Sequence, residues 1–227
     1  MSLRSELAPA ADPEAEGALL RDGLARLGMA ADLRQQRQLL DYLSLLQTWN
    51  RRINLTAVRD PRQMVAYHLL DSLAALAAVE RRRPEAVRRV LDVGSGAGLP
   101  GVVWAVMRPD WAVRCVDAVA KKVGFVQQVA AELGLGGLAA THGRIEALPP
   151  MPADLIVSRA FAALADFVTL SRAHLAPGGC WLALKGRLPD EEMAALPATI
   201  DVFHVEPLTV PGLDAQRCLV WMRPATA

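Results

Sequence analysis

The residues best suited to chemistry lie in one glycine-rich stretch, which runs VLDVGSGAGLPG from Val90 to Gly101. Val90, Leu91 and Val93 predict a buried strand, and the glycines after it predict a sharp turn that a ligand can approach without meeting a Cβ. A helix is expected from about Leu99, with its free N–H groups pointing back towards a bound molecule. This arrangement is typical of a site for a nucleotide-like cofactor.

The glycine spacing fits two kinds of cofactor. Gly96, Gly98 and Gly101 match the G-x-G-x-x-G pattern of dinucleotide-binding proteins, which would suit an NAD-dependent oxidoreductase. Asp92, however, ends the expected strand, where a pyrophosphate would meet a like charge. S-adenosylmethionine has no phosphate, and its sulfonium and ammonium groups both favour a nearby carboxylate. We therefore predict an S-adenosylmethionine site built from Asp92, Gly94, Gly96, Gly98 and Leu99.

A second carboxylate, Asp117, ends the next expected strand, Ala112–Asp117. At this position of a doubly wound sheet, an acidic side chain hydrogen-bonds the ribose hydroxyls of the cofactor. Capping of the helix that follows is the alternative role, and the two roles are compatible.

The loop after the third expected strand, Gly137–His142, contains Ile145 and Glu146. In S-adenosylmethionine folds this loop borders the adenine, so Ile145 would cover the ring and the backbone around Glu146 would bond its edge. Burial of Ile145 in the core is the alternative.

The fourth expected strand, Asp154–Ser158, continues into Ser158-Arg159-Ala160-Phe161, a turn expected to face the reacting methyl group. This turn has neither the Asp or Asn before Pro-Pro-aromatic that grips an exocyclic amine nor the cysteine nucleophile that pyrimidine C5 requires. Guanine N7 already presents a lone pair, so positioning and electrostatics suffice there. We predict Arg159 and Ser158 as catalytic residues, with Arg159 as an anion or guanine ligand rather than a proton carrier.

The net charge of +1 neither demands nor excludes a nucleic-acid partner, but the positions of the cations are informative. Lys121 and Lys185 follow expected strand ends on the cofactor side, or lie in turns near them. We expect them to attract an anionic substrate.

The composition limits the class of protein. The chain has 227 residues and a hydrophobic content of 52%, which suits one large packed domain or a domain with a small extension. Three scattered cysteines and four scattered histidines show no metal-ligand spacing, so no metal is expected. The chain shows neither a membrane span nor a secretory signal, so we expect a cytoplasmic protein. We also expect a monomer, although no sequence feature addresses the oligomeric state.

Two kinds of periodicity divide the chain. Helices are expected over Ala15–Met29, Leu33–Asn50 and from a cap at Asp60 to about Glu80, so residues 1–84 would form an N-terminal helical extension. Strand–helix alternation follows over residues 85–227, with further strands at Arg89–Val93, Gly179–Lys185, Ile200–Val205 and Arg217–Met222. The expected fold is α/β, a Rossmann-like class I methyltransferase sheet of seven strands closed by a hairpin that makes the last strand antiparallel.

With these residues in place, the chain resembles the small-subunit ribosomal RNA guanine-N7 methyltransferases, also called glucose-inhibited division protein B. The resemblance extends from about Asn50 to Gly186. Its segments are Asn54–Pro61, His68–Ser72, Leu91–Gly101, Asp117 with Lys121, Lys122 and Phe125, Arg144–Glu146, Ser158–Phe161 and Leu184–Gly186. Tyr67 departs from the Lys or Arg that this family often has before the histidine.

The resemblance implies methyl transfer to N7 of one guanine in the decoding-region loop of 16S rRNA, with naked RNA or the small ribosomal subunit as partner. It implies cofactor contacts at Gly94, Leu99, Ile145, Glu146 and Arg159. It places His68 and Asp71 near the mouth of the site as substrate-binding residues, unless they form a buried polar pair that joins the extension to the sheet. A methyltransferase acting on a small molecule or a protein is the alternative function.

Overall fold

The computed structural model describes residues 12–82, 87–159, 161 and 163–225. Within these residues, seven strands form one sheet in the order β3-β2-β1-β4-β5-β7-β6. Each strand begins and ends within four residues of the prediction. The strands are β1 (Arg89–Val93), β2 (Ala112–Asp117), β3 (Leu138–His142), β4 (Ala153–Ser158), β5 (Leu175–Lys185), β6 (Ile200–Pro207) and β7 (Cys218–Pro224).

The direction of the strands defines two different edges of the sheet. Strands β1 to β5 pair in parallel, whereas β7 is antiparallel to both β5 and β6, which confirms the expected closing hairpin. The carboxyl ends of the parallel strands therefore share one edge, and β7 begins at that same edge because it runs the opposite way. The strand order reverses between β1 and β4, where such folds open a crevice for ligands.

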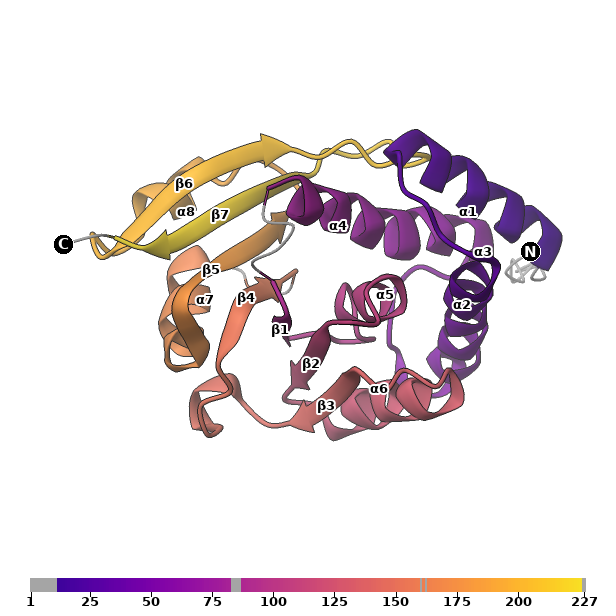
Figure 1. Ribbon diagram of the computed structural model, residues 1–227, viewed down its shortest axis with the longest axis horizontal. Coiled ribbons are helices and arrows are strands. Elements are labelled where there is room, and N and C mark those ends of the chain that lie inside the picture. Colours follow the sequence, from indigo (N-terminus) through magenta and orange to yellow (C-terminus); the bar gives the residue numbers. More distant parts are fainter. Residues whose placement is uncertain (1–11, 83–86, 160, 162, 226–227) are drawn as a thin grey trace, which may run out of the picture.

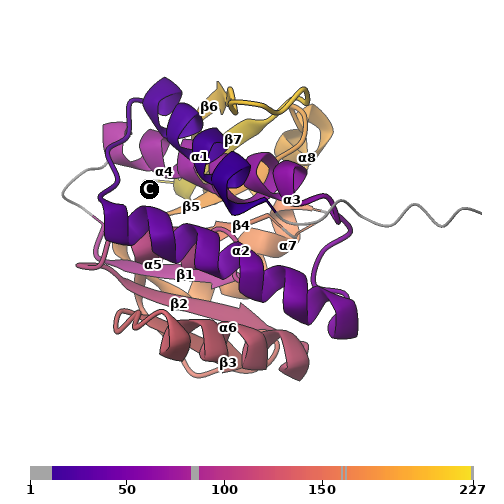
Figure 2. The ribbon, with the colours of Figure 1, turned by 90° about the vertical axis from the view of Figure 1, so that its right-hand side faces the viewer.

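Helices cover both faces of the sheet (Figure 1). Helices α7 and α8 lie on one side, and α4, α5 and α6 lie on the other, with α1 and α2 outside them; Figure 2 shows α2 crossing this layer. The helices are α1 (Pro13–Leu27), α2 (Leu33–Ile53), α3 (Pro61–Met64), α4 (Asp71–Arg82), α5 (Gly101–Met107), α6 (Ala120–Glu132), α7 (Leu164–Ser171) and α8 (Asp190–Ala194). Single 3₁₀ turns lie at Ile145–Ala147 and Arg172–His174.

Local signals explain the starts of α2 and α3. Asp32 and Gln35 form a reciprocal capping box at the start of α2, and Asp60 accepts a hydrogen bond from the N–H of Arg62 at the start of α3. The single helix expected from Asp60 to about Glu80 is interrupted, because Val65–Leu70 is a π-helical segment between α3 and α4. Helix α5 begins at Gly101, slightly later than the predicted start near Leu99.

One apolar core joins the N-terminal helices to the sheet. Leu43 of α2, Leu73 of α4 and Trp104 of α5 belong to the same buried cluster as Leu155 of β4 and Trp221 of β7. The other face of the sheet packs against α7 through a second cluster. The expected boundary between residues 84 and 85 lies outside the described residues, so the division into an extension and a methyltransferase domain stays a prediction.

Candidate functional site

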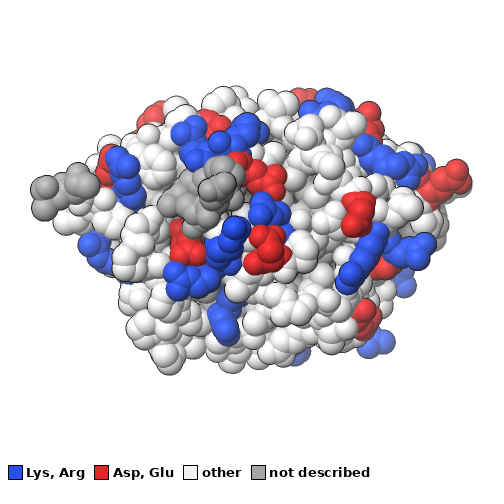
Figure 3. All heavy atoms as spheres, viewed as in Figure 1, with Lys and Arg blue, Asp and Glu red and all other residues white. Residues whose placement is uncertain are grey.

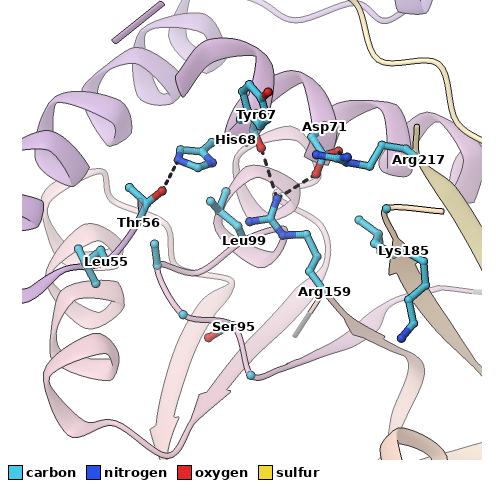
Figure 4. Close-up of a pocket in the computed structure, with 15 residues that line it drawn as sticks. Leu55, Thr56, Tyr67, His68, Asp71, Ser95, Leu99, Arg159, Lys185 and Arg217 are labelled. Carbon is cyan, nitrogen blue, oxygen red and sulfur yellow. Dashed lines mark hydrogen bonds and ion pairs between the residues drawn. The ribbon is translucent and has the colours of Figure 1, made fainter. Parts of the chain in front are cut away.

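A pocket of ≈ 470 Å³ opens at the carboxyl ends of β1, β4 and β5 (Figure 4). The N-terminal helices close its opposite wall through the α2–α3 connection and the π-helical segment. The pocket is lined by Leu55, Thr56, Tyr67, His68, Asp71, Gly94, Ser95, Gly96, Ala97, Leu99, Arg159, Leu184, Lys185, Gly186 and Arg217. The structure therefore brings together seven of the predicted site residues: His68, Asp71, Gly94, Gly96, Leu99, Arg159 and Lys185.

The glycines after β1 serve different structural purposes. Gly96 has φ +58°, and a Cβ built there would meet nothing within 4 Å, so the bare backbone of the loop faces open pocket space. At Gly98 a Cβ would lie 2.5 Å from Cγ2 of Val102, and at Gly101 it would lie 2.6 Å from Sγ of Cys115. Gly96 thus keeps the pocket open, whereas Gly98 and Gly101 let helix α5 pack closely.

Asp92 lies behind the glycine loop and does not line the pocket. Its side chain is fully buried, and Oδ2 accepts a hydrogen bond from the N–H of Gly101 over 2.8 Å. Burial raises the pKa of the carboxyl to about 7, against the hydrogen bond from Gly101, which lowers it. Oδ1 has no hydrogen-bond partner among the described residues, and a direct contact between Asp92 and the cofactor stays a prediction.

Asp117 binds the glycine loop from the end of β2. Oδ2 accepts a hydrogen bond from the N–H of Gly96 over 2.9 Å, and Oδ1 accepts one from the N–H of Val119 over 2.8 Å. The second contact is to Val119, the residue before α6, and no side chain caps the first turn of this helix among the described residues, so the alternative capping role is not supported. The ribose contact at Asp117 stays a prediction.

Asp71 joins the N-terminal helices to two strands of the sheet. Its Oδ2 lies 2.9 Å from Nη1 of Arg159 after β4, and its Oδ1 lies 2.8 Å from Nε of Arg217 before β7 (Figure 4). The carboxylate is only 4% exposed, so these ion pairs link the N-terminal helices to the sheet from a buried position. This geometry fits the alternative in which Asp71 bonds the extension to the sheet. The two guanidinium groups sharing one carboxylate leave an excess of positive charge at the pocket.

His68 contacts Thr56 across the wall of the pocket, with 3.0 Å between Nε2 and Oγ1. The ring is buried, and Nδ1 has no hydrogen-bond partner within the described part of the chain. Burial, followed by the charge of Arg159, lowers the pKa of His68 to about 4. The imidazole is therefore neutral near pH 7.

Two predicted residues make contacts that differ from the expected ones. The Ser158 hydroxyl is buried and donates a hydrogen bond to the carbonyl of Val93 over 2.7 Å, so it joins the ends of β4 and β1 instead of facing the pocket. Lys185 lines the pocket but pairs with Glu192, with 2.6 Å between Nζ and Oε2. A catalytic role for Ser158 and a substrate contact for Lys185 stay predictions.

Three predicted residues lie away from this pocket. Ile145 is buried in the core on the α7 side of the sheet, which fits its alternative role. Glu146 is exposed in the 3₁₀ turn after β3, and Lys121 is exposed on α6. None of them is among the pocket-lining residues of the described chain, so their predicted contacts remain untested. Ala160, within the predicted turn, lies outside the described residues.

Sequence reasoning missed Arg217 and Tyr42. Arg217 precedes the antiparallel strand, so the expected hairpin alone would have placed it at the carboxyl edge. Tyr42 is fully buried and donates its hydroxyl to the carbonyl of Ala97 in the glycine loop, but its periodic position on α2 marked it only as a core residue.

The site fits the predicted cofactor. An open glycine loop, with Asp92 behind it and the carboxylate of Asp117 bonded to it, suits a cofactor that carries positive charge. Arg159 and Arg217 in the same pocket suit its carboxylate. The fold and the site together define a class I S-adenosylmethionine-dependent methyltransferase.

Comparisons with known proteins agree. Residues 35–220 match the family model of rRNA small subunit methyltransferase G, and the chain belongs to this family. It is 56% identical to the "Ribosomal RNA small subunit methyltransferase G" of Methylibium petroleiphilum, covering 89% of this chain and 92% of the relative. The protein of that name from Leptothrix cholodnii is 58% identical, covering 89% and 93%.

A solved structure shares the fold alone. The S-adenosylmethionine-dependent methyltransferase of Thiobacillus denitrificans, crystallised with S-adenosyl-L-homocysteine, superimposes with a TM-score of 0.50 at 17% identity. The match covers 68% of this chain and 91% of that one. Among the described helices, none has the length and apolar character needed to cross a membrane.

Proposed function

We propose that this protein transfers a methyl group from S-adenosylmethionine to N7 of one guanine in 16S rRNA, in the loop of the decoding region. The observation that carries the proposal is the pocket at the carboxyl edge, where two arginines share the single buried carboxylate of Asp71. The surplus positive charge suits an anionic polynucleotide beside the methyl donor. The names of the family and of the relatives support the choice of small-subunit rRNA.

The bound cofactor supplies an electrophilic methyl group on a sulfonium. Gly94, Gly96 and Leu99 would form the floor of its site, with Asp92 and Asp117 behind the loop and Arg159 at its carboxylate. Gly98 would keep the loop compact, and Ile145 and Glu146 are proposed at the adenine.

The acceptor needs no general base, because N7 of guanine carries a lone pair and no proton. The residues around the pocket match this requirement. His68 is neutral near pH 7, and the guanidinium of Arg159 is held by Asp71. The chain would therefore act by orienting the guanine, excluding water and balancing charge. His68, Asp71 and Lys121 are the residues predicted to lie nearest the RNA.

Two further properties belong to this proposal. We expect the protein to act in the cytoplasm, where small ribosomal subunits are assembled. We also expect it to act as a monomer.

The test is transfer of a labelled methyl group to small ribosomal subunits, and separately to naked 16S rRNA, prepared from cells that lack this activity. Nuclease digestion and mass spectrometry then identify the modified nucleoside. We expect 7-methylguanosine at one position. Label in another nucleoside, in ribosomal protein or in small molecules would contradict the proposal.

A further inference from the structure

Lys185 and Glu192 form an ion pair beside the pocket, and Glu192 lies in none of the segments singled out from the sequence. Oε2 of Glu192, on α8, accepts hydrogen bonds from Nζ of Lys185 over 2.6 Å and from the backbone N–H of Leu164 over 3.0 Å. Nζ of Lys185, at the end of β5, also donates to the carbonyl of Phe161 over 3.0 Å. We call this pair the Lys185–Glu192 latch. It binds the connection between β4 and α7 at two backbone positions.

Helix α7 depends on this latch for its first turn. Its N-cap residue is Ala163, whose methyl side chain cannot accept a hydrogen bond. Glu192 supplies the missing acceptor from another helix, and its negative charge also suits the positive end of the α7 dipole. Helix α8 is only five residues long, and none of its described residues is buried. Met193 of α8 packs against the apolar cluster on the α7 side of the sheet, and Glu192 next to it adds the polar contact to α7.

The connection that the latch holds is the one that carries Arg159. Ser158 anchors its beginning to the carbonyl of Val93, and Arg159 is drawn towards Asp71. The latch fixes its far end at Phe161 and Leu164. Arg159 is thus placed between two anchors, one on the N-terminal helices and one on β5 and α8.

The same geometry changes the role of Lys185. Its side chain is 13% exposed, and its charge is balanced by Glu192. In Figure 4 its ammonium group points away from Arg159 and Asp71. A lysine that contacts RNA phosphates would instead present its charge to the open pocket.

We infer that Glu192 is a positioning residue for the methyl transfer, acting through Lys185 and the backbone of Phe161 and Leu164 to place Arg159, and that Lys185 does not bind the RNA. This inference rests on the proposed function. The Lys185–Glu192 latch would therefore affect the rate of the chemical step and not the affinity for substrate.

The first test compares Glu192→Gln and Lys185→Met with the parent in methyl transfer to small ribosomal subunits. We expect kcat to fall about 10-fold in each, because small displacements of a catalytic group have effects of this size, while KM for subunits changes by less than about twofold. The double variant should be no slower than the slower single variant, since the two residues act as one unit. Glu191→Gln, which changes a neighbouring exposed carboxylate on the same helix, is the matched control and should keep the parent kcat.

Glu192→Asp keeps the carboxylate on a shorter side chain and should recover part of the lost kcat, which also covers the case in which Glu192→Gln folds poorly. A parent-like kcat in Glu192→Gln, or equal losses in Glu192→Gln and Glu191→Gln, would overturn the inference.

The second test measures RNA affinity against salt concentration. Loss of one phosphate contact lowers the slope of log K against log salt by about one. We expect Lys185→Met to keep the parent slope. A reduced slope with a raised KM would show that Lys185 binds RNA and would overturn the inference. A parent protein that transfers no methyl group to subunits would instead remove the proposed function, so the two failures are distinguishable.

Discussion

The two edges of the sheet use arginine in different ways. At the amino edge, Arg88 pairs with Asp110 over 3.2 Å and Arg89 pairs with Asp154 over 2.7 Å, each beside the start of a strand. These arginine side chains are about half exposed. Figure 3 shows basic and acidic side chains lying side by side on the face that it displays. Such pairs are screened by solvent and contribute little to stability.

At the carboxyl edge, Arg159 and Arg217 share Asp71 in a largely buried cluster. Burying a carboxylate costs free energy unless a cation pairs with it. Because two guanidinium groups pair with the one carboxylate of Asp71, the cluster carries a net positive charge. The same residue type therefore forms a solvated ion pair at one edge of the sheet and lines a ligand site at the other, and its position in the fold decides which. The predictions below test this difference, beginning with the largest expected effect.

Gly96→Asp should abolish cofactor binding. A side chain at φ +58° is strained and would enter the open space of the pocket, where its charge and volume compete with the ligand. Calorimetric titration with S-adenosylmethionine should show at least about a 100-fold loss of affinity, equivalent to about 2.7 kcal/mol. Gly124→Asp on α6, also with open space around the added Cβ, is the control and should bind like the parent. Equal affinities in all three proteins would show that the loop is not the cofactor site.

Asp71→Asn should destabilise the protein and slow methyl transfer. Removing the shared charge leaves Arg159 and Arg217 without their anion in a buried setting, with an expected cost of about 3 kcal/mol. The matched variant at the amino edge is Asp110→Asn, whose carboxylate is 51% exposed, and it should cost less than about 1 kcal/mol. Urea unfolding measures both. The comparison between the edges fails if the two losses are the same.

Asp92→Asn should change how stability depends on pH. The folded pKa of about 7 lies above the ordinary value of 3.8, so the folded protein prefers the protonated carboxyl. This contribution is present at low pH and is lost as the pH rises from about 4 towards about 7. The free energy of unfolding should therefore decrease more between pH about 5 and pH about 8 in the parent than in Asp92→Asn. Parallel profiles would mean that Asp92 is ionised at both values.

The sequence predicted the fold well because its signals are local. Apolar runs bounded by turns located the strands to within four residues, and the glycine spacing located the loop. Asp60 and Asp32 show why helix starts are readable, since a cap needs only the residues next to it. The π-helical segment at Val65–Leu70 was missed because its local pattern is that of an ordinary helix.

The contacts inside the site could not be predicted in the same way. The family resemblance placed Asp71 near the pocket, and strand-end positions placed Arg159 and Lys185 there. Their partners, however, lie 146, 88 and 7 positions away along the chain. Asp92 and Asp117 show a related limit. Their spacing indicated a cofactor, yet each carboxylate also hydrogen-bonds the backbone at the glycine loop or the start of α5, which only the folded chain reveals.

The most direct test of the account is the single-turnover rate of methyl transfer to small ribosomal subunits by Arg159→Ala and Arg89→Ala. Each change removes an arginine side chain, one from the carboxyl edge of the sheet and one from the amino edge. Arg159→Ala should stay folded, because Arg217 still pairs with Asp71. We expect its rate to fall by about 10² to 10³, whereas Arg89→Ala should stay within about twofold of the parent. Equal rates in the two variants would contradict the placement of the catalytic site at the carboxyl edge.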